Sequence, residues 1–276
     1  MDTLIFIDMD GTLLNEAHQI LPGSQAAIRR ITAMGGIRVI LSSARPPRAM
    51  EKYHVQLGLR SPLICYNGAL ILHGDYPERF DILRSAAIAP GYLDTITEQA
   101  AQYGLTASYY HLNDWYVHTH DQWILQEEVI TGTKATLQEK SWLGSLWPEL
   151  DGPNKILLMG KPSDITAAEM ELKGRWGKDL SIYKSKDTYL EIMNPSASKK
   201  TAMEWLQHQY GLSPSNLIAI GDHFNDVEML RYAGLGIAMG NAPEAVKAQA
   251  DFVTLDHNAE GIAFALDKFF PGSALP

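Results

Sequence analysis

Two carboxylates that lie two residues apart follow directly on an apolar run near the start of the chain. The segment 8–12 reads Asp-Met-Asp-Gly-Thr, and residues 4–7 before it are all apolar. Side chains two positions apart on a strand face the same side, and Gly11 allows the backbone to turn sharply around a ligand. We expect Asp8 to attack a phosphorus atom, and Asp10 to protonate the leaving oxygen and then deprotonate the hydrolytic water. An acidic turn without chemistry is the simpler alternative, because such turns are common.

A second acidic segment, residues 221–226, reads Gly-Asp-His-Phe-Asn-Asp and also follows an apolar run directly. A phosphate ester and Asp8 are both anionic, so their approach requires a hard cation between them. Mg²⁺ suits this task because it prefers a few carboxylates together with phosphate and water oxygens. Asp222 would supply the second carboxylate. Asn225 and Asp226 lie near the start of a predicted helix, where Asp226 would order the metal site, cap the helix, or do both.

Two further polar residues follow or open predicted elements. Ser43 comes after the run 37–41, which is apolar except for Arg38, and Lys199 lies at the start of a predicted helix. The Ser43 hydroxyl could donate to a phosphoryl oxygen, and the Lys199 ammonium could neutralise charge on the phosphoryl group and both carboxylates. Neither residue is informative alone, because Ser is common in turns and Lys is usually solvated. Their weight comes from their order and placement along the chain.

The elements that must position these residues alternate between strands and helices. Short apolar runs that end abruptly in polar or Gly-rich residues are predicted as buried strands at residues 4–7, 37–41, 63–66, 217–220 and 235–239. Helical patterns lie between several of them. This alternation predicts an α/β fold with a Rossmann-like, doubly wound parallel sheet covered on both faces. In such sheets ligands bind beyond the carboxyl ends of the strands, where these polar residues would meet.

The middle of the chain has a different composition from its two ends. Five of the six tryptophans lie between residues 83 and 186, together with further strand-like runs, and a strand pattern resumes at residues 188–192. We therefore predict a discontinuous catalytic core of residues 1–82 and 187–276. The inserted residues 83–186 would form a second domain.

Composition narrows the class of protein and its partners. The 276 residues carry a formal net charge of -9, which argues against the phosphate backbone of a nucleic acid as a partner. Cys65 is the single cysteine, so no intrachain disulfide forms and the chain suits a reducing compartment. The first residues lack a basic region, and no apolar run approaches the roughly 20 residues that span a bilayer. We expect a cytoplasmic protein without a membrane partner; the oligomeric state is open.

Taken in order, these motifs resemble the haloacid-dehalogenase-like (HAD) superfamily of aspartyl-phosphate enzymes. The sequence has Asp-x-Asp-Gly-Thr, a strand-end Ser, a Lys and Gly-Asp-x-x-Asn-Asp. Further segments, at residues 66–69, 236–242 and 258–263, are similar to the Cof-type branch of sugar-phosphate and cofactor phosphatases. The resemblance covers residues 1–82 and 187–276 by motif. It covers residues 83–186 by position alone, and it implies that they form the α/β cap domain of this branch, which selects the substrate.

The resemblance implies a metal site and a phosphate site. Mg²⁺ would be bound by the Asp8 carboxylate, the Asp10 backbone carbonyl and the Asp222 carboxylate, with Ser43 and Lys199 on the phosphoryl group. Supporting or substrate-phosphate positions would be Gly11, Thr12, Asn67, Asn194, Asn225 and Asp226. Lys200 stands where this branch often has Gly, which makes it a rival for Lys199.

The activity that we expect is hydrolysis of small phosphate monoesters through an aspartyl phosphate on Asp8. Sugar phosphates, or phosphorylated cofactors such as FMN or pyridoxal phosphate, are the substrates that the branch suggests. The motifs hold only the phosphate, so they do not choose among these. Two alternatives stay open: a phosphotransferase or phosphomutase that uses the same aspartate, and a non-catalytic protein that binds a phosphorylated metabolite.

Overall fold

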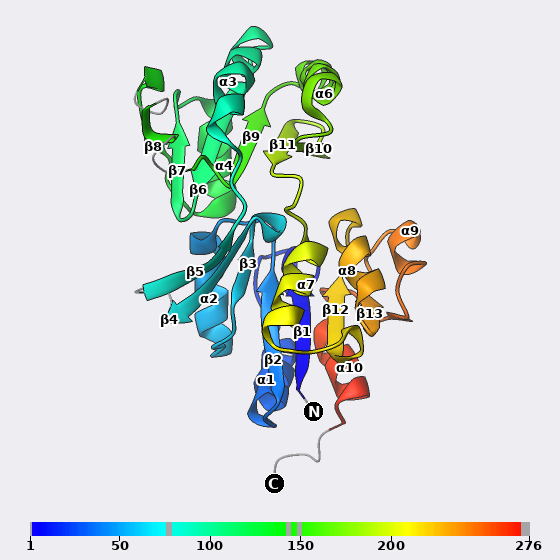
Figure 1. The fold of residues 1–276 in the computed structure, drawn as a ribbon. Coiled ribbons are helices and arrows are strands. Elements are labelled where there is room, and N and C mark those ends of the chain that lie inside the picture. The colour runs from blue at the N-terminus through cyan, green and yellow to red at the C-terminus, as the bar shows by residue number, and fades with distance from the viewer. Residues whose placement is uncertain (1, 76–78, 142–144, 148–150, 272–276) are drawn as a thin grey trace. The chain divides into compact units, whose positions relative to one another are not determined.

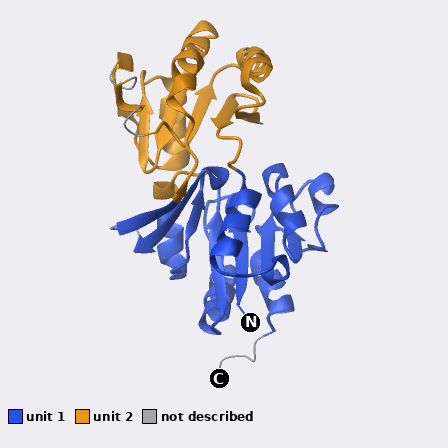
Figure 2. Ribbon diagram, in the orientation of Figure 1, with its two compact units in different colours: residues 1–44, 50–83, 198–276 blue, residues 45–49, 84–197 orange. Residues whose placement is uncertain are grey.

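The structure is a computed structural model that describes residues 2–75, 79–141, 145–147 and 151–271 (Figure 1). Trp142, one of the tryptophans counted above, lies outside this range. The chain forms two compact units, which Figure 2 shows in blue and orange. Unit 1 comprises residues 1–44, 50–83 and 198–276, and unit 2 comprises residues 45–49 and 84–197. Within the described ranges, no helix has the length and apolar character needed to cross a bilayer.

Unit 1 is built on an eight-stranded sheet with the order β14-β13-β12-β1-β2-β3-β4-β5. Its strands are β1 (Thr3–Asp8), β2 (Ile37–Ser42), β3 (Leu63–Cys65), β4 (Leu70–Asp75), β5 (Arg79–Ser85), β12 (Leu217–Gly221), β13 (Leu235–Ala238) and β14 (Phe252–Val253). The pairs from β14 to β3 are parallel, and β4 runs antiparallel to β3. The predicted α/β fold with a parallel sheet is therefore confirmed, with an antiparallel strand added beside β3.

Helices cover both faces of this sheet, which explains why its central strands carry nearly continuous apolar runs. Leu4 and Phe6 of β1 pack with α7 (Lys199–Gln209) and α8 (Val227–Tyr232) in one apolar core. Ile5 and Ile7 alternate with them and face the other side. There, α1 (Pro22–Ala33) contacts both β2 and α10 (Gly261–Phe269). The remaining helices are α2 (Pro47–Leu57) and α9 (Glu244–Lys247).

Unit 2 contains a six-stranded sheet with the order β10-β11-β9-β6-β7-β8. Its strands are β6 (Thr106–His111), β7 (Asp114–Val117), β8 (Thr136–Leu137), β9 (Lys155–Met159), β10 (Ser181–Lys186) and β11 (Tyr189–Met193). Its helices are α3 (Leu93–Gln102), α4 (Gln122–Thr131) and α6 (Pro162–Trp176). Apolar side chains of α3 and α6 pack on Ile156 and Leu158 of β9, so the unit has a core of its own.

The strand expected at residues 188–192 is β11, and it belongs to the sheet of unit 2 rather than to the core sheet. It pairs antiparallel with β9 on one side and β10 on the other. Unit 2 therefore extends to residue 197 instead of ending at 186. The apolar run predicted a strand correctly, but a buried run does not reveal which sheet it joins. The two residues between β10 and β11 were the overlooked signal, because so short a connection is typical of a hairpin.

Candidate active site

Polar residues from several chain segments meet at the carboxyl edge of the parallel strands of unit 1. Asp8 is the last residue of β1 and lies opposite Ser42, the last residue of β2. On its other side β1 pairs with β12, which ends at Gly221 and leads directly to Asp222. Asp8, Asp222 and the nearby Asp226 each offer a carboxylate oxygen, and these three oxygens lie within 4.8 Å of one another. The sequence motifs at these strand ends are thus gathered in one place.

Lys199 links two of these carboxylates from inside the protein. Its ammonium is completely buried and donates a hydrogen bond to Oδ1 of Asp8 and another, of 2.6 Å, to Oδ1 of Asp226. Burial alone would lower the pKa of Lys199, but Asp226 and Asp8 outweigh it, so this pKa lies above its ordinary value. Lys199 therefore stays charged and fixes Asp8 relative to the loop that carries Asp222.

The position of Lys199 is set by the start of α7. Ser198 caps this helix: its Oγ accepts the backbone N–H of Thr201 at 3.1 Å, while Oγ1 of Thr201 accepts the backbone N–H of Ser198. Such reciprocal bonds satisfy donors that a helix start leaves without partners. Gly68 lies against the backbone carbonyl of Ser198, where a Cβ would overlap it, so glycine is required for this approach. The cap therefore fixes Lys199 as the first residue of α7.

Asp226 holds the loop after β12 in its conformation. Its Oδ2 accepts the backbone N–H groups of Asp222 and His223, each at 3.0 Å, and its Oδ1 accepts Lys199. The side chain of Asp226 is completely buried, and a Cβ on residue 221 would overlap it, so glycine is required at that position. Both carboxylate oxygens are thus engaged by protein donors. Asp226 therefore supports the site and is less suited than Asp8 or Asp222 to hold a metal directly.

The loop after β1 is fastened to Asp222 by two side chains. Thr12 is buried and donates from Oγ1 to Oδ1 of Asp222 at 2.8 Å. Asn241 donates from Nδ2 to the backbone carbonyl of Gly11 at 2.8 Å and lies 3.4 Å from Oδ2 of Asp222. Gly11 has a φ of +79°, and a Cβ at this position would overlap the Asp222 carboxylate. Glycine is therefore needed here for both conformation and space.

Three of the predicted phosphate-contacting residues lie beside one another. The backbone N–H of Asn67 donates to the carbonyl of Ser43 at 2.9 Å, and the N–H of Ser43 donates to Ile64 at 2.9 Å. Nδ2 of Asn225 donates to Oδ1 of Asn67 at 3.1 Å. These bonds join the ends of β2 and β3 to the loop after β12. The left-handed conformation of Asn67, with φ of 50°, is one that Asn tolerates better than most residues.

Asp10, the predicted acid and base, differs from Asp8 in exposure. Its side chain is 48% exposed, and its Oδ1 lies 3.6 Å from Nδ1 of His18. A carboxyl group that exchanges protons with a leaving group and with water requires such access. His18 was not singled out in the sequence; it lies in the loop before α1 and gives no strand-end signal.

The structure treats the two neighbouring lysines differently. Lys200 forms an ion pair with Glu204 at 2.5 Å and lies 5.1 Å from the ring centre of Tyr232, on the outside of α7. Lys199 alone of the two contacts Asp8. Asn194, expected near the phosphate, belongs to unit 2, where Nδ2 donates to the carbonyl of Ala87 at 2.9 Å. Its predicted role stays a prediction.

The acidic cluster fits a hard cation such as Mg²⁺. Three carboxylates and one ammonium sum to a charge of -2 (-3 + 1) in a largely buried place. Burial raises the pKa of the Asp8 carboxyl well above its ordinary value, and burial also raises that of Asp222. A divalent cation would offset this cost of keeping both groups ionised. Oxygen donors of this kind are those that Mg²⁺ prefers, so the residues present fit the ion.

The sequence of the whole chain identifies its family. The sequence model of the haloacid dehalogenase-like hydrolases matches residues 5–266. The chain belongs to this family. The resemblance drawn from the motifs is thus confirmed, and the hydrolase carries its four motifs at one edge of one sheet.

Relatives of the hydrolase match it along nearly their full lengths. A Haemophilus influenzae protein with phosphatase in its name is 34% identical, over 97% of this chain and 98% of its own. The 5-amino-6-(5-phospho-D-ribitylamino)uracil phosphatase YitU of Bacillus subtilis is 28% identical, over 97% of both chains. The crystal structure of a haloacid dehalogenase-like hydrolase from Bacteroides thetaiotaomicron has a TM-score of 0.86 and 26% identity, covering 98% of this chain and all of that one. The hydrolase is an enzyme of the phosphatase type.

Proposed function

We propose that the hydrolase releases phosphate from small phosphate monoesters through an aspartyl phosphate on Asp8. The observation that supports this most directly is the buried Lys199 ammonium, which contacts Asp8 and Asp226 while Asp222 completes the acidic cluster. A buried lysine held against a nucleophile is suited to neutralise a phosphoryl group that arrives there. A protein that only binds phosphate would gain nothing from a carboxylate at this position.

In the first step Asp8 would attack phosphorus. Its Oδ1 is engaged by Lys199, so the attack falls to Oδ2. The Oδ2–P bond forms, the bond from phosphorus to the ester oxygen breaks, and Asp10 gives its proton to that oxygen. In the second step Asp10 takes a proton from water, the water oxygen bonds to phosphorus, and the Oδ2–P bond breaks. Inorganic phosphate leaves, and Asp8 is regenerated.

The other site residues would orient and neutralise the phosphoryl group. Mg²⁺, held by the Asp8 and Asp222 carboxylates and the Asp10 carbonyl, would supply positive charge that lets the two anions approach. Ser43 and Lys199 would donate hydrogen bonds to phosphoryl oxygens. Asn67 and Asn194 are proposed to face the substrate phosphate as well. Thr12, Asn225 and Asp226 would hold the loops in place.

The proposed substrates are sugar phosphates or phosphorylated cofactors such as FMN or pyridoxal phosphate. The name of the B. subtilis relative, a phosphatase of a phosphoribitylamino-uracil, supports this class. A cytoplasmic location, and the absence of nucleic-acid and membrane partners, stay predictions from composition.

A panel of phosphorylated metabolites, assayed with and without Mg²⁺, tests the proposal. We expect metal-dependent phosphate release, and a loss of about a thousandfold or more in Asp8→Asn, because the amide cannot act as the nucleophile. Asp94→Asn, at an exposed position of α3, is the matched control and should keep full activity. Equal turnover by Asp8→Asn and wild type would refute the mechanism. An isomerised sugar phosphate in place of inorganic phosphate would identify a mutase.

A further inference from the structure

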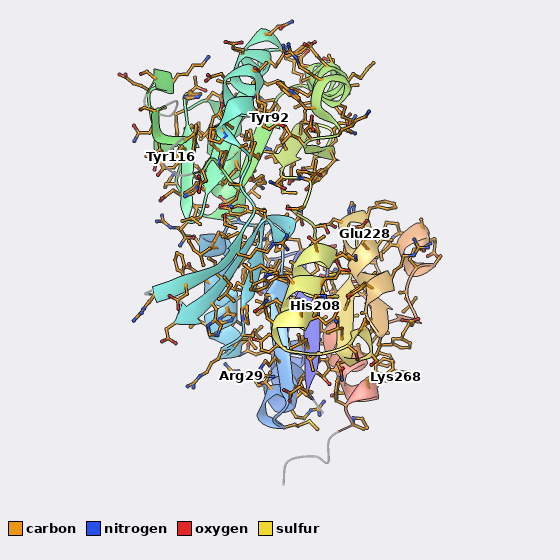
Figure 3. All side chains as sticks on the ribbon, in the orientation of Figure 1. Arg29, Tyr92, Tyr116, His208, Glu228 and Lys268 are labelled. Carbon is orange, nitrogen blue, oxygen red and sulfur yellow. The ribbon has the colours of Figure 1, made fainter. Side chains whose placement is uncertain are left out.

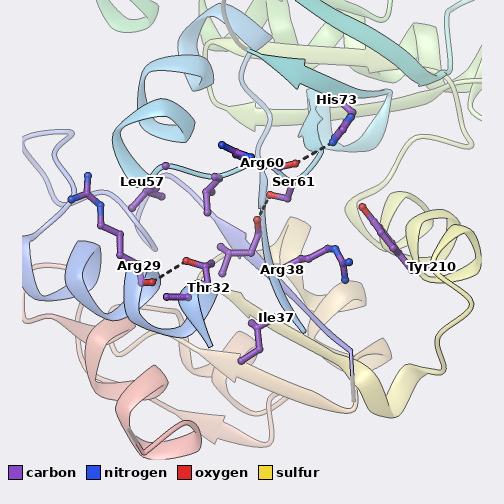
Figure 4. A pocket seen from close by; sticks show the side chains of 13 residues that line it. Arg29, Thr32, Ile37, Arg38, Leu57, Arg60, Ser61, His73 and Tyr210 are labelled. Atoms are coloured by element: carbon purple, nitrogen blue, oxygen red, sulfur yellow. Dashed lines mark hydrogen bonds between the residues drawn. The ribbon is translucent and has the colours of Figure 1, made fainter. Parts of the chain in front are cut away.

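A cavity lies at the end of unit 1 opposite the acidic cluster (Figure 4). It measures about 570 Å³ and is lined by the last turn of α1, the start of β2, residues 57–61 and Tyr210. β2 runs from this cavity at Ile37 to Ser42 beside Asp8, which spans roughly 16 Å at about 3.3 Å per residue. Figure 3 shows Arg29 and Glu228, which lie on these two sides, at opposite ends of the unit. A ligand in this cavity would not touch the phosphoryl site.

The lining of this cavity is positively charged, whereas the chain as a whole is negatively charged. Arg29, Arg38 and Arg60 line it together with His73, and no Asp or Glu belongs to its described lining. The whole chain has 32 acidic residues against 23 Lys and Arg. Three guanidinium groups from α1, β2 and the loop before β3 therefore concentrate positive potential in one hollow of an acidic protein.

The internal contacts of these arginines explain their placement only in part. Arg29 donates from Nη2 to the carbonyl of Gln56 at 2.7 Å, a bond expected where a helix ends. Arg38 lies 3.3 Å from an Asp2 oxygen and 5.1 Å from the ring centre of Tyr210, and it is 41% exposed. Among the described residues, no acidic side chain forms an ion pair with Arg29 or Arg60. Each of the three guanidinium groups thus keeps donors available to a ligand.

The remaining lining residues of the cavity indicate which other groups a ligand would have besides its anionic group. Ile37, Leu57 and the ring of Tyr210 provide apolar surface beside the arginines. An adjoining hollow that shares Arg60 and His73 also contains Asp75 and Asp81, so the anionic group is expected toward Arg29 and Arg38. The volume lies within the range of about 300 to 1,000 Å³ that is usual for small-molecule sites.

We propose that this cavity binds a small organic phosphate at a site separate from the catalytic one. Its phosphate group would accept hydrogen bonds from the guanidinium forks, which match phosphate oxygens in geometry and charge. A terminal phosphate has three oxygens and up to two charges, so more than one arginine can bind it. The organic part would lie against Ile37, Leu57 and Tyr210.

Calorimetric titration of inorganic pyrophosphate into the Mg²⁺-free protein tests the site. We expect Arg29→Gln/Arg38→Gln to weaken binding by about tenfold or more, since each lost charged contact removes roughly a factor of ten. Arg175→Gln/Arg231→Gln, with the same change in charge at exposed positions outside the cavity, should differ from wild type by less than about twofold. Asp8→Asn should bind as wild type does.

Three results of this titration would overturn the proposal. One is equal pyrophosphate binding by wild type and the double variant. Another is no binding by wild type up to about 10 mM, a concentration that corresponds to only a few kcal/mol. A third is tighter binding of citrate than of pyrophosphate, which would assign the cavity to carboxylates.

A separate measurement guards against misfolding of the double variant. Arg29→Gln alone changes an exposed side chain and should leave the fold intact, so weaker pyrophosphate binding by this variant reports the lost contact. In wild type, pyrophosphate should shift the backbone amide resonances of Gly58 and Ser61 at the cavity and leave those of Thr12 and Asp222 in place. Shifts confined to Thr12 and Asp222 would place the ligand at the acidic cluster and refute the second site.

Discussion

Both units bury ionisable side chains, but they differ in how many carboxylates share one cation. Asp8, Asp222 and Asp226 share the single ammonium of Lys199, which leaves a charge of -2. The burial of so many like charges is costly unless a further cation or a proton joins them. The uncompensated negative charge therefore favours the binding of a cation at the place where the motifs predict a metal and a phosphoryl group.

In unit 2, Glu191 and Glu127 are buried carboxylates with separate partners. Glu191 lies 4.0 Å from the buried Lys155 ammonium and accepts the Tyr183 hydroxyl at 3.0 Å. Glu127 accepts the Tyr189 hydroxyl at 2.7 Å. Lys155 balances the charge of Glu191, and Glu127 is stabilised by a hydroxyl. Among the described residues, only unit 1 gathers three acidic side chains closely enough to hold one metal ion, so this cluster is the one suited to bind a cation.

Removal of the Lys199 ammonium from the acidic cluster of unit 1 should have the largest effect on stability and turnover. Lys199→Ala leaves three carboxylates without their buried partner, so we expect a loss of about 3 to 5 kcal/mol in the free energy of unfolding and about a thousandfold in turnover. Lys200→Ala removes only a surface ion pair and should cost less than about 1 kcal/mol. Urea unfolding and phosphate release measure both. The reverse ranking of the two lysines would contradict the assignment of Lys199.

Disruption of a balanced pair in unit 2 should cost less. Glu191→Gln leaves Lys155 without its carboxylate, but the amide can still accept the Tyr183 hydroxyl, so we expect a loss of about 1 to 3 kcal/mol. The double variant Lys155→Met/Glu191→Leu should recover much of this, because no uncompensated charge remains. Urea unfolding of this double variant and of its two single variants, Lys155→Met and Glu191→Leu, tests the coupling. Losses of the single variants that add up in the double variant would show that the pair is not coupled.

Metal should stabilise unit 1 through its unbalanced charge. At Mg²⁺ concentrations ten times the dissociation constant, the free energy of unfolding should rise by about 1.4 kcal/mol. Asp222→Asn should abolish this rise, while its metal-free form should be at least as stable as metal-free wild type, because one uncompensated charge is gone and the amide oxygen can still accept Thr12. Thermal unfolding of both proteins with and without Mg²⁺ tests these expectations. A metal-free Asp222→Asn variant that is less stable than metal-free wild type would contradict the charge argument.

The smallest effect should come from pH, through Glu128 in unit 2. The Lys134 ammonium at 2.6 Å, with the His120 ring at 3.2 Å, lowers the pKa of Glu128 to about 2 from an ordinary 4.5. A lowered carboxyl pKa contributes stability that is complete above pH 4.5 and is lost as the pH falls toward 2. Glu128→Gln should therefore be less stable than wild type at pH 6, and this difference should shrink on acidification. A constant difference in urea midpoint would contradict it.

Much of unit 1 could be predicted because its central parallel strands are short, mainly apolar and sharply ended. Asp8, Ser43 and Asp222 follow such runs directly or after one residue, and strand ends of a parallel sheet lie on one edge. Unit 2 offered less, because antiparallel strands give no comparable rule for their order. β11 was assigned to the wrong sheet for this reason.

The contacts within the site required the structure itself. Lys199 donates to both Asp8 and Asp226, and no local pattern connects residues that lie 191 positions apart. Asn241 follows β13 as Asp222 follows β12, so its strand-end position was a usable signal that the prediction did not use for the site. His18 gave no such signal.

The division of unit 1 into separate stretches of chain has a consequence for its synthesis. Leu4 of β1 pairs with Leu217 of β12, and every residue of unit 2 from 84 to 197 is made between them. At about 5 to 20 residues per second, these 213 positions take roughly 10 to 40 s, during which one edge of β1 has no strand beside it. Unit 2, whose strands lie close in sequence and which has its own core, can fold during that time. On the ribosome, the part of the chain that begins first would be completed last.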